Sequence, residues 1–280
     1  MINFVFQNPT KIVFGRDTTD LVGKETRRFG RRVLLTYGRG SIKRTGLYDR
    51  VMDSLKAEGI EVFELGGIQP NPRIDSVRRG VEICKREKID FVLAVGGGSV
   101  IDAAKAIAAG AKYDGDPWDF YARRAEIKDA LPLGTVLTLA ATGSEMNGNS
   151  VLTNWETREK LAISSAHLYP RFSILDPQNT FSVPREHTAY GAVDILGHVF
   201  EQYFDSTPAT PLQDRMAEGL MRTVIETLPA ILADPTDYEA RATMMWCGTM
   251  ALNNIIGCGK EQDWATHMIE HELSAIYDIP

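Results

Sequence analysis

The sequence predicts a parallel α/β domain followed by an all-helical domain. Up to about residue 180, short apolar runs alternate with segments whose apolar residues recur every three or four positions. Beyond Ser182-Val183-Pro184 the strand-like runs end, and long segments of helical period follow. Strands that alternate with helices imply parallel pairing with right-handed crossovers. We therefore expect one domain over residues 1–180 and a second over residues 181–280.

The elements of both parts can be predicted in order. Residues 4–6 and 11–15 flank an Asn-Pro turn signal, which predicts a hairpin at a sheet edge or a dimer contact. The other elements of the first part are strands over 33–37, 61–65, 91–95, 135–139 and 172–175, a helix through Leu47, Val51 and Leu55, and a helix over 74–88 with Val77, Val81 and Cys84 inward. The second part predicts helices over 189–203, 211–232, 239–254 and 264–277.

Composition and charge exclude several classes of protein. The chain has 280 residues, 44% hydrophobic and 24% charged, values that are ordinary for a globular protein. Its net charge of −6, without a run of five like charges, predicts no nucleic-acid partner. An apolar stretch long enough for a membrane span and a secretory signal are both missing from the sequence. The 3 cysteines form no CxxC pair, so we expect a reducing cytoplasm.

A glycine-rich turn follows the buried strand over 91–95. Gly96, Gly97 and Gly98 with Ser99 stand between this strand and a helix start. Glycines let the backbone approach a phosphate closely, and the N–H groups at a helix start attract its charge. The turn therefore predicts a pyrophosphate site, with a tight strand-to-helix connection as the alternative. It matches neither a Walker A loop nor the GxGxxG fingerprint.

The turn after the first long strand bears on which dinucleotide would bind. It reads Gly38, Arg39, Gly40, Ser41, with the basic Lys43 and Arg44 next. An NAD site usually places an acidic residue near the adenosine ribose, whereas basic residues suit the 2′-phosphate of NADP. The turn therefore favours NADP; the alternative is a solvated basic turn.

Two histidine-containing pairs on predicted helices are candidate metal ligands. Asp194 and His198 are four residues apart, as are His267 and His271, so each pair shares a helix face. Such pairs on separate helices can converge on Fe(II), Zn or Mn, although each alone could be structural. A rival interpretation is a zinc metallopeptidase, because residues 267–271 match H-x-x-E-H with Glu270 as the water-activating residue.

Taken together, the motifs resemble those of the iron-containing alcohol dehydrogenase family, in particular its NADP-dependent, butanol dehydrogenase-like branch. The resemblance runs along the whole chain. It rests on the residues 37–41, 66–72, 94–102, 138–145, 175–177 and 262–273. It implies a Rossmann-like first domain and an overall dehydroquinate synthase-like architecture.

The resemblance also implies roles for individual residues. Gly96, Gly97, Gly98 and Ser99 would hold the cofactor pyrophosphate, with Asp102 nearby. Arg39 stands where relatives of this branch often have a third glycine. The remaining implied roles are the nicotinamide side for Thr138 and Thr142, a ribose contact for Lys160, the metal for Asp194, His198 and His267, and a proton relay beside the substrate for His271.

One departure from the family pattern concerns the metal shell. In the family a fourth ligand, a histidine, follows shortly after the equivalent of Ile279-Pro280, where this sequence stops. The sequence is therefore expected to be a truncated product or a fragment, and a nucleotide-binding remnant without turnover is a further alternative. Three ligands plus water still form a metal site.

The expected function is a hydride transfer between NADP(H) and a primary alcohol or aldehyde such as butanol or butanal. A divalent ion, Fe²⁺ or alternatively Zn²⁺, would polarise the substrate oxygen. A homodimer is the default expectation, with neither nucleic acid nor membrane as partner.

Overall fold

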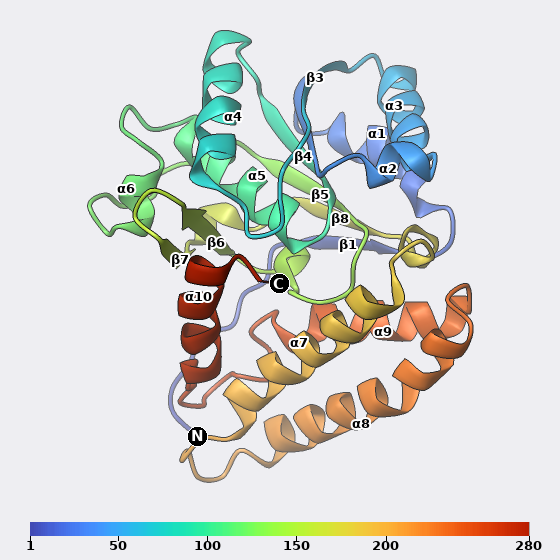
Figure 1. The fold of residues 1–280 in the computed structure, drawn as a ribbon, viewed down its shortest axis with the longest axis vertical. Coiled ribbons are helices and arrows are strands. Elements are labelled where there is room, and N and C mark those ends of the chain that lie inside the picture. Colours follow the sequence, from blue (N-terminus) through green and yellow to red (C-terminus); the bar gives the residue numbers. More distant parts are fainter. Residues whose placement is uncertain (280) are drawn as a thin grey trace.

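The computed structural model describes residues 1–279, and its centre is a six-stranded parallel sheet (Figure 1). The sheet order is β1-β8-β5-β4-β2-β3, and each neighbouring pair is parallel. Its strands are β1 Lys11–Phe14, β2 Arg32–Tyr37, β3 Glu61–Leu65, β4 Phe91–Gly96, β5 Leu133–Leu137 and β8 Phe172–Leu175. This arrangement confirms the predicted fold class for the first part of the chain.

Helices cover both faces of the sheet. Because successive side chains of a strand point to opposite faces, Leu34 of β2 joins the core beneath α4 (Ile74–Arg86) and α5 (Gly98–Gly110), whereas Leu35 joins the core beneath α3 (Leu47–Ala57). The shorter elements are α1 Val22–Thr26, α2 Ser41–Arg44, α6 Trp118–Tyr121 and the 3₁₀ turns η1 Thr18–Leu21, η2 Ser144–Met146, η3 Ala166–Leu168 and η4 Pro177–Thr180.

The remaining chain is helical, as predicted. Helices α7 (Arg185–Tyr203), α8 (Pro211–Ala233) and α9 (Tyr238–Ala251) share an apolar core. Helix α10 (Ala265–Tyr277) leaves these three and packs along β7, on the underside of the first part (Figure 1). The helix that carries His267 and His271 therefore touches both parts of the molecule. Among the described residues, none of the helices has the length and hydrophobicity to span a bilayer.

The predicted opening hairpin is wrong. Residues 4–6 form no strand, and β1 pairs in parallel with β8 at the sheet edge. The Asn-Pro signal marks an anchored bend: the Asn8 side chain donates to the carbonyl oxygens of Met146 and Asn253, at 2.8 and 3.3 Å. The segment before it runs toward Gly259, where the Ile2 amide donates to the Gly259 carbonyl.

The sequence interpretation missed an antiparallel hairpin, β6 (Asn149–Asn154) with β7 (Glu159–Ser164). Polar contacts hold β6 in place, whereas a buried strand is usually recognised by its apolar side chains. The Asp102 carboxylate on α5 accepts the Val151 amide, and the Asp102 carbonyl accepts the Ser150 hydroxyl, both at 2.9 Å. The predicted strand over 135–139 also lies two residues earlier, at Leu133–Leu137.

Candidate active site

The glycine turn lies where β4 ends and α5 begins. Gly97 is the N-cap of α5 in an extended conformation, and no side chain caps the helix. A Cβ at Gly98 would lie 2.4 Å from Thr142 Oγ1, and one at Gly97 would lie 3.2 Å from Leu139 Cβ. Only glycine therefore lets the loop after β5 close over the turn. A helix start without a side-chain cap suits a pyrophosphate.

The loop after β5 joins the glycine turn to the helical part. The Thr138 amide donates to the Gly96 carbonyl at 3.1 Å, so Thr138 lies beside the turn together with Thr142. Further along, Ala140 meets Gly191 of α7 so closely that a Cβ there would lie 2.4 Å from the Ala140 oxygen. Gly191 is three residues before Asp194. This loop thus connects the predicted phosphate site with the predicted metal site.

Asp102 lies on α5, but both of its carboxylate oxygens are bound by protein groups. One accepts the Ser144 hydroxyl at 2.6 Å and the other accepts the Val151 amide at 2.9 Å. Burial raises the pKa of Asp102, and the nearby Lys105 opposes that rise. These contacts make Asp102 an anchor for η2 and β6; its contact with a cofactor stays a prediction.

The turn between β2 and α2 carries Arg39, and Lys43 follows it in α2; both residues are exposed, but their contacts differ. Gly40 has a φ of 101°, which requires glycine. The Arg39 guanidinium lies in solvent, with one 3.4 Å contact to Gln69, and Ser41 is exposed beside it. The Lys43 ammonium, by contrast, lies 3.6 Å from the Glu64 carboxylate.

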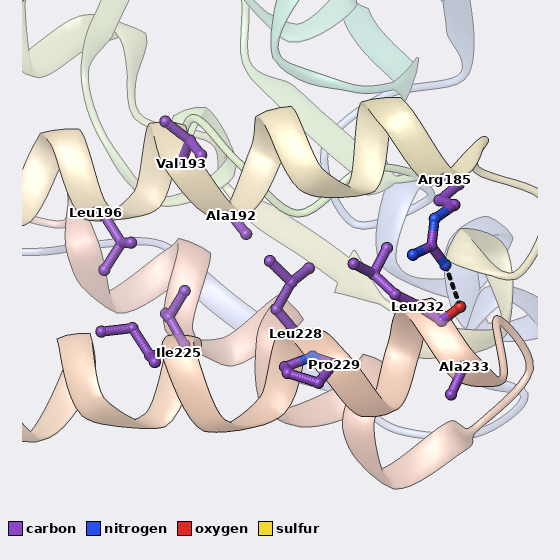
Figure 2. A pocket seen from close by; sticks show the side chains of 10 residues that line it. Arg185, Ala192, Val193, Leu196, Ile225, Leu228, Pro229, Leu232 and Ala233 are labelled. Carbon is purple, nitrogen blue, oxygen red and sulfur yellow. Dashed lines mark hydrogen bonds between the residues drawn. The ribbon is translucent and has the colours of Figure 1, made fainter.

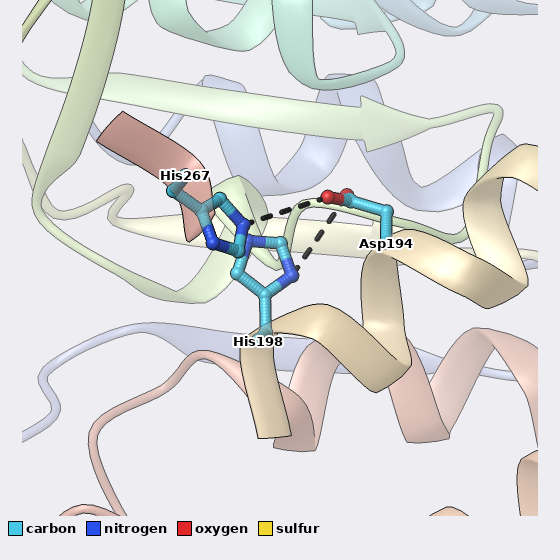
Figure 3. A group of neighbouring side chains, drawn as sticks. All are labelled: Asp194, His198 and His267. Carbon is cyan, nitrogen blue, oxygen red and sulfur yellow. Dashed lines mark ion pairs between the residues drawn. The ribbon is translucent and has the colours of Figure 1, made fainter. Parts of the chain in front are cut away.

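Asp194, His198 and His267 converge (Figure 3). One donor atom from each lies within 4.8 Å of the others. Asp194 Oδ2 is 3.8 Å from His198 Nδ1, and Asp194 Oδ1 is 3.8 Å from His267 Nε2, both too long for hydrogen bonds. His198 Nδ1 is buried without a hydrogen-bond partner. One carboxylate and two imidazoles form a donor set that suits Fe(II) or Zn.

The protonation states of Asp194 and His198 suit a cation. Burial lowers the pKa of His198, and the charge of Asp194 opposes that shift only in part. Burial also disfavours an ionised Asp194, yet the neighbouring His198 and His267 outweigh it and hold the carboxyl pKa below its usual value. A neutral imidazole and an ionised carboxylate are the forms that bind metal.

Glu201 belongs to this site, and the sequence interpretation missed it. Its buried carboxylate oxygen Oε1 accepts both the backbone N–H and the ring Nδ1–H of His267, at 2.9 Å each. Although burial opposes it, the nearby carboxylates of Asp194 and Glu201 raise the pKa of His267. Because Nδ1 is occupied, Nε2 is the nitrogen that faces Asp194. The signal was present in the spacing of Asp194, His198 and Glu201, which places all three on one face of α7.

Residues of the H-x-x-E-H match have separate partners. His267 belongs with Asp194 and His198, while Glu270 accepts two hydrogen bonds from Lys160 of β7, at 2.8 and 3.1 Å. His271 Nε2 lies 3.8 Å from Glu270 Oε2. The geometry therefore does not support a zinc peptidase site at residues 267–271.

A separate apolar groove of about 530 Å³ runs between α7 and α8 (Figure 2). Val193 and Ile225 line it with their side chains largely exposed. None of the predicted site residues lines this groove. Its position therefore adds nothing to the assignment of the candidate active site.

Comparison with known proteins shows the family. Residues 9–177 match the model described as iron-containing alcohol dehydrogenase, and residues 188–280 match the model described as Fe-containing alcohol dehydrogenase family, C-terminal. The chain belongs to the iron-containing alcohol dehydrogenase family. This confirms the resemblance that the sequence motifs indicated.

Individual relatives narrow the comparison. The chain is 59% identical over 280 residues to the probable NADH-dependent butanol dehydrogenase 1 of Bacillus subtilis and 46% identical over 283 residues to the NADPH-dependent aldehyde reductase YqhD of Escherichia coli. Each match covers 100% of this chain and 72% of the relative. The crystal structure of NADH-dependent butanol dehydrogenase A from Thermotoga maritima matches with a TM-score of 0.98 and 51% identity, over 100% of this chain and 70% of that one.

Proposed function

We propose that this protein is a metal-dependent oxidoreductase that transfers a hydride between NADP(H) and a primary alcohol or aldehyde such as butanol or butanal. The observation that carries the proposal is the convergence of Asp194, His198 and His267, joined to the glycine turn by the loop after β5. The names of the B. subtilis and E. coli relatives support the substrate class.

The residues of the cluster fit a divalent ion. Asp194, His198 and His267 would hold it, Fe²⁺ first and Zn²⁺ as the alternative, and Glu201 would keep the His267 ring oriented. A bound ion of this kind supplies Lewis acidity toward an alcohol or carbonyl oxygen. The buried, unpartnered Nδ1 of His198 is the observation that favours a ligand here.

The chain's own residues supply binding and orientation. The N–H groups at the start of α5, reached past Gly96, Gly97, Gly98 and Ser99, would bind the pyrophosphate. Thr138 and Thr142, beside that turn, would line the nicotinamide side, and Lys160 would reach the ribose. Such positioning would bring the substrate carbon and the nicotinamide together, which lowers the entropic part of the barrier to hydride transfer.

His271 would carry the proton that hydride transfer requires. Burial and the charge of Lys160 lower the pKa of His271 to about 4, so the imidazole is neutral at pH 7, which is the form that can accept a proton. Its side chain is 14% exposed, which leaves a route to solvent.

Arg39 favours NADP(H) over NAD(H). Its guanidinium is exposed at the first turn with a single weak contact, so it is available to a 2′-phosphate. Glu64, the acidic side chain near this turn, has oxygens that already accept the hydroxyls of Tyr37 and Tyr48, at 2.8 and 2.7 Å. Since several relatives are named as NADH-dependent, the preference needs a direct test.

The proposal includes the molecular context of the enzyme. A small alcohol or aldehyde is the substrate, a homodimer is the expected assembly, and the cytoplasm is the expected location. Neither nucleic acid nor membrane is a proposed partner.

The test is nucleotide oxidation with butanal as substrate. We expect NADPH loss that Fe²⁺ or Zn²⁺ stimulates and a chelator abolishes, with slower loss of NADH. Peptide cleavage would favour the metallopeptidase alternative. Nucleotide binding without turnover under every metal condition would indicate a remnant, and faster loss of NADH would overturn the NADP preference.

A further inference from the structure

An ion pair joins the hairpin of the first part to the helix that carries His267 and His271. Lys160 lies on β7 and Glu270 on α10, and both hydrogen bonds from the Lys160 ammonium go to this carboxylate. The Lys160 side chain is 10% exposed and the Glu270 side chain 41%. Because an ammonium removed from water is costly without a counter-charge, Glu270 sets where Lys160 lies.

Lys160 lies between the two halves of the candidate site. Its charge reaches Asp102 on α5, Asp194 on α7 and His271 on α10. Burial raises the pKa of both aspartates and lowers that of His271, while the charge of Lys160 lowers the pKa of all three. Since Lys160 lies on β7 and is bonded to α10, it stands where the first part of the molecule meets the helix of His267 and His271.

Contacts other than the Lys160–Glu270 ion pair also attach α10 to the first part of the molecule. At the other end of the helix, Arg73 pairs with Asp278 at 2.9 Å, and the Asn71 side chain donates to the Ile279 carbonyl at 3.0 Å. These contacts dock the end of α10 independently. They also offer a matched control, since breaking them loosens the same helix without touching Lys160.

We propose that Glu270 is a positioning residue, which holds the Lys160 ammonium toward the nucleotide and His271 toward the substrate. This inference rests on the proposed function, because it takes Lys160 as a ribose contact. It gives Glu270 a role that differs from the water activation expected of a metallopeptidase glutamate. The Glu270 carboxylate bonds to Lys160 from another element, and it keeps Lys160 and His271 in fixed positions relative to each other.

The test compares Glu270→Gln with Asp278→Asn, measuring the Kd for NADPH by fluorescence titration together with Tm. Glutamine keeps the shape of the side chain but removes its charge. We expect Glu270→Gln to raise the Kd about tenfold, which is the loss of one charge-assisted interaction. Asp278→Asn is expected to lower Tm comparably while leaving the Kd within about twofold of the wild-type value. An unchanged or lower Kd for Glu270→Gln overturns the proposal, as does an equal rise in both variants.

A charge swap separates positioning from simple docking. The double variant Lys160→Glu, Glu270→Lys restores an ion pair between β7 and α10, so we expect it to recover Tm but not the Kd. Recovery of both would contradict the proposal, because any ion pair would then serve. If Glu270→Gln fails to fold, Glu270→Asp takes its place, with an expected Kd rise of about threefold and an unchanged Kd as the contrary result.

The outcome for the wild-type protein separates this inference from the proposed function. If the wild-type chain binds neither NADPH nor NADH, the proposed function fails. If the wild-type chain binds NADPH and Glu270→Gln binds it equally well, only the role of Glu270 fails.

Discussion

Helices α5 and α10 have 13 residues each, yet the protein holds them in different ways. In α5, 11 residues are buried, among them the small alanines that pack on the sheet and on α4. In α10 only Ser274 and Ala275 are buried. Apolar packing therefore fixes the helix of the predicted phosphate site, while the helix of His267 depends on polar contacts.

The polar contacts of α10 come from three other elements. Glu201 of α7 binds His267, Lys160 of β7 binds Glu270, and Arg73, just before α4, binds Asp278. Large apolar side chains of the same helix, such as Met268 and Ile269, are 60% and 63% exposed. The phosphate end of the site is thus sensitive to volume changes, and the metal end to charge changes.

The largest effect is expected from His267→Ala. Removing one of three ligands should weaken metal binding more than about 100-fold, with a modest fall in Tm, because the buried Glu201 carboxylate loses its bond to the ring but keeps its bond to the backbone N–H. Glu201→Gln should give an intermediate loss of about 10- to 100-fold, since it removes only the charge of the group that orients the ring. Metal content and metal titration measure both. Full metal occupancy in His267→Ala would exclude this residue as a ligand.

Gly98→Ala tests the packed end of the site. The added methyl would lie 2.4 Å from Thr142 Oγ1, so we expect a loss of about 1–3 kcal/mol in the free energy of unfolding, together with weaker nucleotide binding. Gly219→Ala in α8 is the matched control, because nothing lies within 4 Å of its Cβ position. That variant should be stabilised by about 0.5–1 kcal/mol. Urea unfolding compares them; equal stability of both variants would show that the turn is not tightly packed.

A smaller effect is expected from acid on the metal-free protein. The pKa of His271 is lowered to about 4 in the folded state, so as the pH falls through about 6.5 the unfolded chain takes up a proton that the folded protein does not. Between about pH 7 and about pH 5.5 this one group should remove about 1 kcal/mol of stability. Chelator-treated His271→Gln should show a correspondingly shallower loss. An identical pH profile would show that burial does not shift this group.

Much of the fold and of the candidate site could be predicted from patterns along single helices and strands. Features that depend on contacts between different elements could not be predicted in this way. The four-residue spacing of Asp194 and His198 puts both on one helix face, and the glycines at 96–98 mark a close approach whatever the ligand. The β6–β7 hairpin was missed because buried polar bonds to Asp102 replace apolar alternation. Glu201 and Glu270 were missed as partners because their bonds to His267 and Lys160 cross from one element to another, over 66 and 110 residues of sequence.

The opening hairpin shows the converse error. Its Asn-Pro signal is real, but the Asn8 side chain closes only a local turn, in which its oxygen accepts the Thr10 amide, while its amide nitrogen donates to carbonyl groups of distant loops. Local turn chemistry cannot distinguish a reversal of the chain from an anchored bend.

The most direct test of the account is a crystal of the protein grown with Zn²⁺ and NADP⁺, with diffraction data collected at the zinc edge. The account predicts one anomalous peak bounded by Asp194, His198 and His267, and a pyrophosphate at the start of α5 with its nicotinamide end directed toward that peak. An anomalous peak elsewhere, or a nucleotide bound away from Gly96, Gly97 and Gly98, would contradict it.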